Sequence, residues 1–346
     1  MKKHGKIMIT VVIILVVIVI ITIVFMKNIK QKDKENVGEI ITEERYKDIE
    51  EISTYNNPII PEGFKKVETE TASWELENGI PKGWNNGLVI EDEKGNQFVW
   101  VPVKFTPNLE DYTVNNGYVY ANVGINYNEI EFIQILKYQG FYVARYEAGL
   151  PNIISEQTNE FSEESNNVEG IPTSQKNQIV WNFLSWQTAK INAQKMYESN
   201  NLKSDLITNR QWQDILLWIS NLGYNLEDSQ EYGNYSNTIF NFSGYYSTDY
   251  GKTYKYSENK SKQTFNMILS TGASERNKIN NIYDLAGNVA EFVDVYRWID
   301  NNEIKESLNL KGGYYDNISN YYSISSNMSI STPNSKQGFR IVLYLE

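Results

Sequence analysis

The first apolar segment of the chain, Ile7–Met26, is an uncharged run of 20 residues interrupted only by Thr10 and Thr22. An α-helix rises 1.5 Å per residue, so this run is long enough to cross a bilayer core of roughly 30 Å. A cleaved signal peptide is the alternative, but the run is long for one and ends without a small-x-small cleavage site. The pattern therefore predicts a transmembrane helix at 7–26 after a short tail at 1–6.

Lysines flank this helix on both sides, so the positive-inside rule does not choose an orientation. We place the amino terminus inside because the tail is only six residues long and the Trp/Tyr-rich remainder is typical of an exported domain. Residues 27–57 are rich in Lys and Glu, which indicates a juxtamembrane stalk that ends at Pro58 and Pro61. The sequence thus predicts a single-pass protein of the cell membrane with an extracytoplasmic domain at 58–346.

Beyond the stalk, apolar positions come in short runs that are typical of strands. Residues 88–90 and 97–103 are two such runs, and the polar turn between them ends in Gly95-Asn96, which is a hairpin signal. Residues 141–147 form another run, ended by Gly149. The pattern predicts at least three strands in this part of the chain.

Two helices and two long loops complete the expected organisation. Apolar residues at helical spacing predict amphipathic helices at 185–199, with a Ser cap, and at 209–222. The stretches 153–178 and 222–265 are polar and dotted with glycine, and loops of this length usually carry function. We therefore expect a loop-rich α+β domain.

The amino-acid composition excludes several types of catalytic and metal site. The net charge is -11 and the folded part has no long Lys/Arg block, which argues against nucleic acid as a partner. The chain has no Cys, so disulfides, thiolate metal sites and cysteine nucleophiles are excluded. The single His, His4, lies in the tail, so no catalytic triad or multi-histidine site can form in the domain. What remains is a recognition protein, a structural envelope protein, or an enzyme of unrecognised chemistry.

Seven segments of the domain follow a recognisable order. They are Phe98–Pro102, Ala144–Glu147, Pro172–Ala193, Leu206–Trp212, Asn281–Phe292, Lys311–Tyr314 and Gly338–Arg340. In that order they resemble the signature segments of the formylglycine-generating-enzyme, or sulfatase-modifying-factor, family, whose later segments are LYDMxGNVWEW, RGGSW and GFR. The resemblance covers residues 88–345. It implies the low-secondary-structure variant of the C-type-lectin fold.

The departures from this family concern its chemistry. The family's oxidases bind copper through two cysteines shortly before the GFR strand, and Tyr314–Gln337 contains none. Its iron-dependent relatives need a histidine cluster, which is also absent. Lys311 replaces the usual Arg, while Ala290 and Phe292 replace the usual Trp residues. The resemblance therefore implies the fold without the oxidase activity, and no copper is expected.

Asn288 and Glu291 match family positions near a structural calcium site. The resemblance implies that Gly287 and Val289 would add backbone oxygens to these side chains, which suits the preference of Ca²⁺ for hard oxygen ligands. The alternative is that Asn288 caps a turn and Glu291 is an ordinary carboxylate. Structural Ca²⁺ is thus one of two interpretations of this segment.

Other conspicuous residues have simpler interpretations. Arg340 is predicted to satisfy backbone carbonyls or a buried carboxylate. The tryptophans are predicted to be core aromatics, and they are Trp100, Trp181, Trp186 and Trp212.

The segment Tyr314–Gln337 has the composition of a binding surface. Tyr, Asn or Ser occupy 15 of its 24 positions, as in antibody paratopes. The stretch resembles the part that diversity-generating retroelements vary in binding proteins, and we predict that it contacts a protein or glycan ligand. The predicted contact residues are Tyr314, Tyr315, Asn317, Asn320, Tyr321 and Tyr322. The same residue types are frequent throughout the chain, so a scaffold role is the alternative, and the binding surface would then lie between Leu222 and Phe265.

The absence of cysteine ligands for copper gives a first testable prediction. The purified protein supplied with copper should not convert a sulfatase-type cysteine peptide to formylglycine, because no thiolate is present to hold the metal. Mass spectrometry of the peptide measures the conversion. Turnover above a no-protein control would contradict the prediction.

Overall fold

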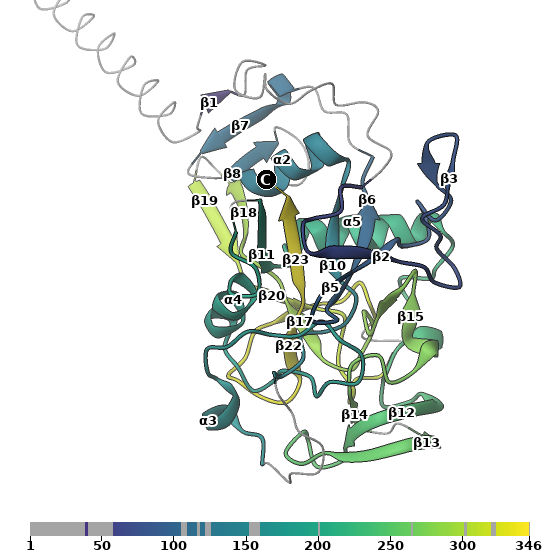
Figure 1. Cartoon of the computed structure of the whole chain (residues 1–346). Helices are drawn as coiled ribbons and strands as arrows, with labels where there is room; N and C mark the ends of the chain where they lie inside the picture. The colour runs from purple at the N-terminus through teal and green to yellow at the C-terminus, as the bar shows by residue number, and fades with distance from the viewer. Residues whose placement is uncertain are drawn as a thin grey trace, which may run out of the picture. The chain divides into compact units, whose positions relative to one another are not determined.

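The computed structural model describes residues 39–40, 58–104, 109–115, 118–121, 126–151, 160–199, 201–263, 266–300, 303–319 and 323–345 (Figure 1). The predicted tail, the predicted transmembrane helix and nearly all of the predicted stalk lie outside these residues. Within them, no helix combines the length and the apolar character needed to cross a membrane. The described part is an α+β structure, rich in strands and with few helices, as the sequence predicted.

The chain divides into two compact units, which the sequence did not predict. The first comprises Met1–Tyr46, Pro107–Glu129 and Arg297–Lys305, and the second comprises Lys47–Thr106, Ile130–Tyr296 and Glu306–Glu346. The parts of the first unit are far apart in sequence but bonded to each other. Asn126 Nδ2 donates a hydrogen bond to Arg297 O at 2.7 Å, and the Arg297 guanidinium lies 4.2 Å from the ring centroid of Tyr118.

Short strands make up the described part of the first unit. One sheet has the order β1-β7-β8-β9, and a separate hairpin pairs β18 with β19. The strands are β1 (Glu39–Ile40), β7 (Tyr112–Asn115), β8 (Tyr118–Ala121), β9 (Tyr127–Asn128), β18 (Tyr296–Asp300) and β19 (Glu303–Ser307), and the 3₁₀ turn η2 (Leu109–Asp111) precedes β7.

The second unit is built on a six-stranded antiparallel sheet with the order β11-β23-β10-β6-β5-β2. Its strands are β11 (Leu202–Leu206), β23 (Ile341–Leu345), β10 (Gly140–Ala144), β6 (Gln97–Pro102), β5 (Val89–Asp92) and β2 (Phe64–Val67). The predicted hairpin is confirmed as β5–β6, with Val89 opposite Val99 and Gly95 at a φ of +87°. Every residue of β10 and β23 is buried, so these two strands form the middle of the core.

Both predicted helices are present, and their caps explain where they begin. In α4 (Trp186–Gln194), the Ser185 side chain accepts a hydrogen bond from Thr188 N. In α5 (Asn209–Asn221), Thr208 and Gln211 form a capping box. The helix α4 ends before the predicted Ser199. Two further helices are α2 (Glu129–Tyr138) and α3 (Glu163–Asn166).

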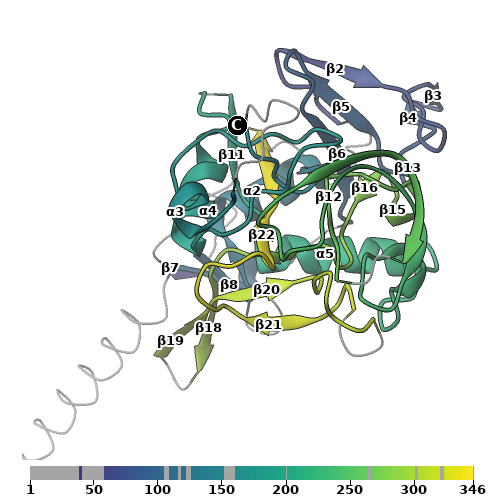
Figure 2. The same ribbon diagram turned by 90° about the horizontal axis from the view of Figure 1, so that it is seen from below.

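Four smaller sheets, made of the strands that remain, belong to the second unit. One has the order β13-β12-β14, with β12 (Ile239–Ser247), β13 (Lys255–Gln263) and β14 (Ile268–Leu269). Another has the order β21-β20-β17-β22, with β20 (Asn309–Lys311), β21 (Asn327–Ser329), β17 (Ala290–Phe292) and β22 (Gln337–Phe339) (Figure 2). The two-stranded sheets are β3 (Leu76–Glu77) with β4 (Ile80–Pro81) and β15 (Lys278–Ile279) with β16 (Ile282–Tyr283). Two 3₁₀ turns, η3 (Gln230–Tyr232) and η4 (Glu275–Asn277), complete the elements.

The hairpin β12–β13 corrects the expectation that 222–265 is a loop. Its burial alternates strictly from Ile239 to Gly244, with Phe240 and Phe242 buried. These rings form a small separate core with Met267, Leu269 and Ala273. The alternation of apolar and polar residues at 240–243 is a strand signal that the surrounding polar sequence obscured.

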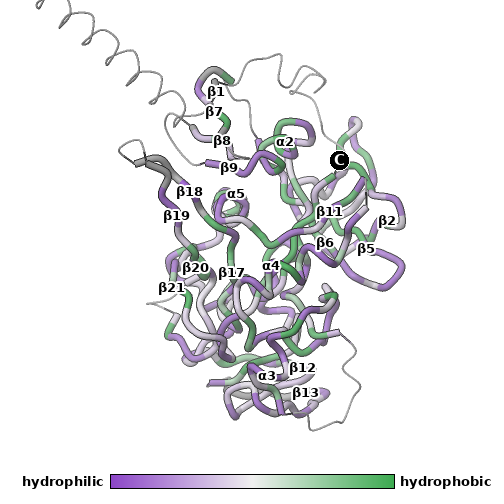
Figure 3. The backbone as a smooth tube through the Cα atoms, turned by 90° about the vertical axis from the view of Figure 1, so that its left-hand side faces the viewer, coloured by the Kyte–Doolittle hydropathy of each residue, from purple (hydrophilic) through white to green (hydrophobic). Residues whose placement is uncertain are grey.

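Hydrophobic segments are short in the described part of the chain (Figure 3), but they converge on one main core in the second unit. Three of the four predicted core tryptophans, Trp100, Trp181 and Trp212, are fully buried. Trp186 is partly buried against this core and donates its ring N–H to Val293 O at 3.0 Å. The core-aromatic prediction is therefore confirmed for three residues and met in part by the fourth.

A charged group lies at the centre of this core. The Arg340 guanidinium is fully buried, and its Nε lies 3.0 and 2.9 Å from the two carboxylate oxygens of Glu291. It also donates to Ala144 O at 3.0 Å and to Tyr283 O at 2.9 Å. The prediction that Arg340 is a structural arginine is confirmed.

Two further buried carboxyl groups, Asp284 and Glu147, lie in the field of Arg340. Burial raises the pKa of Asp284 to about 6, although the N–H of Gly272 and the charge of Arg340 oppose the shift. Burial, together with the charges of Asp284 and Glu291, also raises the pKa of Glu147 well above its usual value. Burial also raises the pKa of Glu291, although the charge and hydrogen bonds of Arg340 oppose the shift. One guanidinium therefore shares its surroundings with three buried acids, all of which hold protons more tightly than exposed acids do.

This proton retention predicts how stability depends on pH. Between its ordinary value of 3.8 and about 6, Asp284 holds a proton in the folded state that the unfolded chain releases, so the free energy of unfolding should fall as pH rises through this window. The Asn side chain of Asp284→Asn cannot ionise, so the free energy of unfolding of this variant should depend less on pH in the window. The variant should be at least as stable as the wild type at about pH 7. Urea unfolding across the window measures both effects. A variant with the wild-type slope would contradict the assignment.

Candidate functional site

The structure places the predicted ligand-contact residues differently from the sequence analysis. Tyr315 is fully buried, and its hydroxyl lies 3.0 Å from Ser335 Oγ. Asn317 is 6% exposed, and its Oδ1 accepts from Tyr314 N. Tyr314 is half-buried under the ammonium group of Lys336, 4.8 Å from the ring centroid.

Tyr315 and Asn317 are therefore scaffold in this structure, which corrects the expectation that they are exposed contacts. Their burial has a physical reason, because Tyr315 N also donates to Asn288 O and Ser236 Oγ donates to Asn317 O. These bonds tie the segment to two distant parts of the chain. Asn320, Tyr321 and Tyr322 lie outside the described residues.

The residues of the predicted calcium site are engaged with protein partners. Asn288 Oδ1 accepts from Asn234 Nδ2 and Leu269 N, both at 3.0 Å, and Asn288 Nδ2 donates to Glu147 Oε2 at 2.6 Å. Gly287 N donates to Gly312 O, and Val289 N donates to Glu147 Oε1. Both oxygens of Glu291 accept from Arg340. Asn288 thus acts as a bridge between three segments, and calcium binding stays a prediction.

An open hollow in the second unit runs beside β12. This hollow, which we name the β12 groove, has a volume of about 820 Å³. One wall is β12 itself, and the other is the loop Ala273–Arg276 with Lys176 and Asn177. Phe240 and Phe242 lie at its base, where the small core supports them. The groove is therefore formed by the part of the chain between Leu222 and Phe265 that the sequence analysis named as the alternative binding surface.

Arg276 forms the most distinctive wall of the β12 groove. Its guanidinium lies 4.8 Å from the ring centroid of Phe240, and it donates to the carbonyl oxygens of Gly233 and Gln230. Among the described residues, it makes no ion pair with a carboxylate. Burial lowers the pKa of Arg276 from its ordinary value, and the guanidinium remains charged. The negative charge of Glu231 opposes this shift. The groove therefore contains a half-buried cation that forms no ion pair within the described residues.

A network of charges and rings fixes the wall next to Arg276. Glu275 accepts hydrogen bonds from Lys176, Lys278 and the Tyr283 hydroxyl. Burial favours the neutral acid, but these three donors outweigh it and lower the pKa of Glu275 to about 2. The ring of Tyr283 stacks on that of Tyr146 with centroids 5.0 Å apart. The single carboxylate of this wall is already neutralised by two lysines, which leaves the groove with a positive balance.

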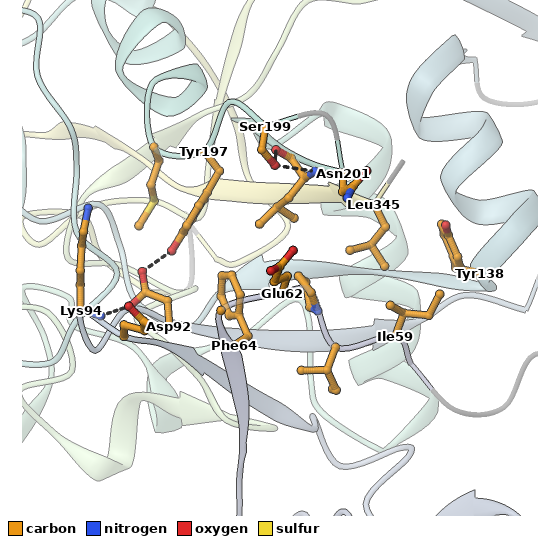
Figure 4. A pocket seen from close by; sticks show the side chains of 16 residues that line it. Ile59, Glu62, Phe64, Asp92, Lys94, Tyr138, Tyr197, Ser199, Asn201 and Leu345 are labelled. Carbon is orange, nitrogen blue, oxygen red and sulfur yellow. Dashed lines mark hydrogen bonds between the residues drawn. The ribbon is translucent and has the colours of Figure 1, made fainter.

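A second hollow, the Tyr197 groove, has a volume of about 800 Å³ and lies where β2 begins and β23 ends (Figure 4). Its polar centre is Asp92, which accepts hydrogen bonds from the Tyr197 hydroxyl at 2.6 Å and from the backbone N–H groups of Lys94 and Asn96. Burial and the Asp92 carboxylate raise the pKa of Tyr197. The Tyr197 ring also packs on Phe64, with centroids 5.5 Å apart.

The two grooves differ in the polar groups that they leave for a ligand. In the Tyr197 groove, Asn96 Nδ2 adds a fourth donor to Asp92, so the carboxylate is saturated by the protein. In the β12 groove, the Arg276 guanidinium is bonded only to carbonyls and a side-chain amide in the described part of the chain. We therefore take the β12 groove as the candidate functional site.

Sequence reasoning missed the individual residues of this groove. Arg276 stands in the polar stretch Ser274–Asn277, which carries no motif, and its partner Phe240 lies 36 positions earlier. The available signal was the alternation at Phe240–Ser243, which predicts a half-buried strand with one exposed face.

Comparison with known proteins adds little to this description. No protein-family model matches the chain, and no curated protein matches it. Among solved structures, the chain is similar to Treponema denticola variable protein 1, with 13% identity and a TM-score of 0.36 over 73% of this chain and 96% of that one. At this level of similarity, function has to be argued from the chain's own residues.

The calcium prediction can be tested by thermal melting. If Ca²⁺ binds the folded state at Asn288 and Glu291, it should stabilise the protein by about 2.7 kcal/mol at a hundredfold excess over the dissociation constant, and a chelator should remove this gain. Glu291→Ala should then abolish the difference between calcium and chelator. Identical melting curves with calcium and with chelator would mean that these residues are scaffold only.

Proposed function

We propose that the chain is a membrane-anchored recognition protein that binds a protein or glycan partner outside the cytoplasm through the β12 groove. The observation that carries the proposal is the open groove of about 820 Å³ beside β12, with a half-buried arginine in its wall and aromatic rings at its base. Arginine and aromatic side chains dominate the energetics of binding interfaces.

Exposed apolar side chains along the same hairpin support this assignment. The exposed fractions are 68% for Ile239, 53% for Tyr256 and 57% for Tyr250, which lies in the turn between β12 and β13. Tyr256 packs on Tyr245 of β12 with ring centroids 5.2 Å apart, so its orientation is fixed before any partner arrives. Rigid, exposed tyrosines provide contact area at a low entropic cost.

The charge of the hairpin also favours a binding role. The chain has a net charge of -11, yet β13 carries Lys255, Lys260 and Lys262 against a single acid, Glu258. This excess of lysine gives β13 a positive charge, and hence a positive local field, in an acidic protein. Such a field guides an oppositely charged partner to the site and suppresses others.

The scaffold of this recognition protein is part of the proposal. We infer a C-type-lectin-like domain of the sulfatase-modifying-factor type, without formylglycine-generating activity. The inference is supported by three of the family-like segments, which meet in one sheet: Glu291 is opposite Lys311 in the antiparallel pair and opposite Gly338 in the parallel pair. The membrane anchor at Ile7–Met26 is supported by its length and lack of charge.

The proposal predicts that Ile239 contributes to binding and not to folding. The full-length chain in mild detergent is tested against an array of glycans and extracellular proteins. Ile239→Ser should weaken the binding that is found by about tenfold, because exposed apolar anchors dominate interfaces. Its free energy of unfolding should change by no more than about 0.5 kcal/mol, as for other surface sites.

Leu217 provides a matched control for this experiment. It is 61% exposed on α5, away from the residues of the groove, so Leu217→Ser removes a similar apolar surface. This variant should bind as the wild type does. Equal losses in both variants, or no binding to any member of the array, would contradict the proposed function.

A further inference from the structure

The backbone of β12 offers an unpaired edge inside the β12 groove. In an antiparallel strand, the N–H and C=O of one residue point to the same edge, and successive residues alternate between the two edges. Ser243 N donates to Ala273 O at 2.9 Å, and Asn241 O accepts from Ser274 Oγ at 2.7 Å, so the odd-numbered residues face the loop at 273–276. The even-numbered residues Phe240 and Phe242 face β13. Ile239 therefore presents both of its backbone groups to the groove.

The loop opposite this edge pairs with only half of it. After Ser274 the chain turns away from β12 in η4, and Arg276 bonds to Gly233 and Gln230 on the far side. In the described part of the chain, this leaves Ile239 N–H, Ile239 C=O and Asn241 N–H without a backbone partner across the groove. The groove thus begins where the natural pairing of β12 stops.

This edge lacks the features that usually prevent strand pairing. Natural edge strands are commonly protected by proline, by inward-facing charges or by a covering segment. The residues that present their backbone to this edge are Ile239 and Asn241, and the Ile239 side chain is 68% exposed. An open edge strand with an exposed apolar residue promotes aggregation unless a binding partner covers it. Strand addition to such an edge is an established mode of peptide recognition.

Electrostatics indicate the kind of peptide that would fit. The groove contains Arg276, which lacks a carboxylate partner in the described residues, and Lys176, which shares Glu275 with Lys278. Three cations therefore surround one carboxylate at this wall. A guanidinium held over an aromatic ring binds carboxylates through its remaining N–H donors. An acidic side chain on the incoming strand would complete this arrangement.

We propose that the edge of β12 at Ile239–Asn241 binds an extended, acidic peptide segment of a partner protein by strand addition. This inference rests on the proposed function, since it assigns a partner class to the same groove. The N–H and C=O of Ile239 and the N–H of Asn241 pair with the peptide backbone. Arg276 receives an Asp or Glu side chain of the peptide.

The test uses a random dodecapeptide library displayed on phage and selected on the full-length chain in mild detergent. Selected peptides should be rich in β-branched residues and should contain Asp or Glu. Asn241→Pro removes the N–H that faces the groove and leaves the ladder to β13 intact, as proline does at edge positions. It should weaken synthetic copies of the peptides by about tenfold or more. Asn241→Ala keeps the N–H and should weaken them by no more than about threefold.

Two further measurements keep the test decisive if the proline variant folds poorly. In the wild type, a bound peptide should slow amide hydrogen exchange at Ile239 and Asn241, because both N–H groups become bonded. Replacing the acidic residue of the peptide by its amide should weaken binding to the wild type by about tenfold, and it should have little effect on binding to Arg276→Gln.

Several outcomes would overturn strand addition. They are recovery of no peptide, peptides that bind Asn241→Pro and Asn241→Ala equally well, and unchanged exchange at Asn241. The proposed function is tested separately, by the array experiment with Ile239→Ser and Leu217→Ser. A partner that depends on Ile239 but not on the Asn241 N–H would leave the recognition function in place and remove only the strand-addition mode.

Discussion

The second unit depends on one buried cation, the guanidinium of Arg340. It bonds to the carboxylate of Glu291 and to the carbonyls of Ala144 and Tyr283, so a single side chain joins β17, β10 and β16. Removing one partner of a buried ion pair leaves a charge without compensation, which costs about 3–5 kcal/mol. In a domain with short strands and long loops, the Arg340 guanidinium links segments that few strand-to-strand hydrogen bonds hold together.

The same arrangement explains why the candidate site can be open without weakening the fold. The rings beneath the β12 groove belong to a small core of their own, formed by Phe240, Phe242, Met267, Leu269 and Ala273. Contact between this core and the Arg340 region runs through loops such as Gly272, whose N–H bonds to Asp284. Under the proposed function, substitutions on the exposed face of β12 should therefore act on binding, while substitutions around Arg340 should act on stability.

Sequence patterns predicted the local features of this structure and missed most long-range ones. The β5–β6 hairpin, the Ser185 cap, the helix that begins at Asn209 and the structural role of Arg340 follow from residue type and spacing, and all were found. The burial of Tyr315 was not predictable from composition, because it depends on Ser335 and Asn288, which are brought to it by the fold. Arg276 and Phe240 likewise meet only through tertiary structure.

The most direct test of this account is the free energy of unfolding of Glu291→Gln, measured beside Glu275→Gln. Both substitutions remove a carboxylate that is bonded to cations, but Glu291 is 1% exposed, whereas the Glu275 side chain is 59% exposed. We predict a loss of about 3–5 kcal/mol for Glu291→Gln and of no more than about 1 kcal/mol for Glu275→Gln. Equal, small losses in both variants would show that the Arg340 anchor does not hold the domain together.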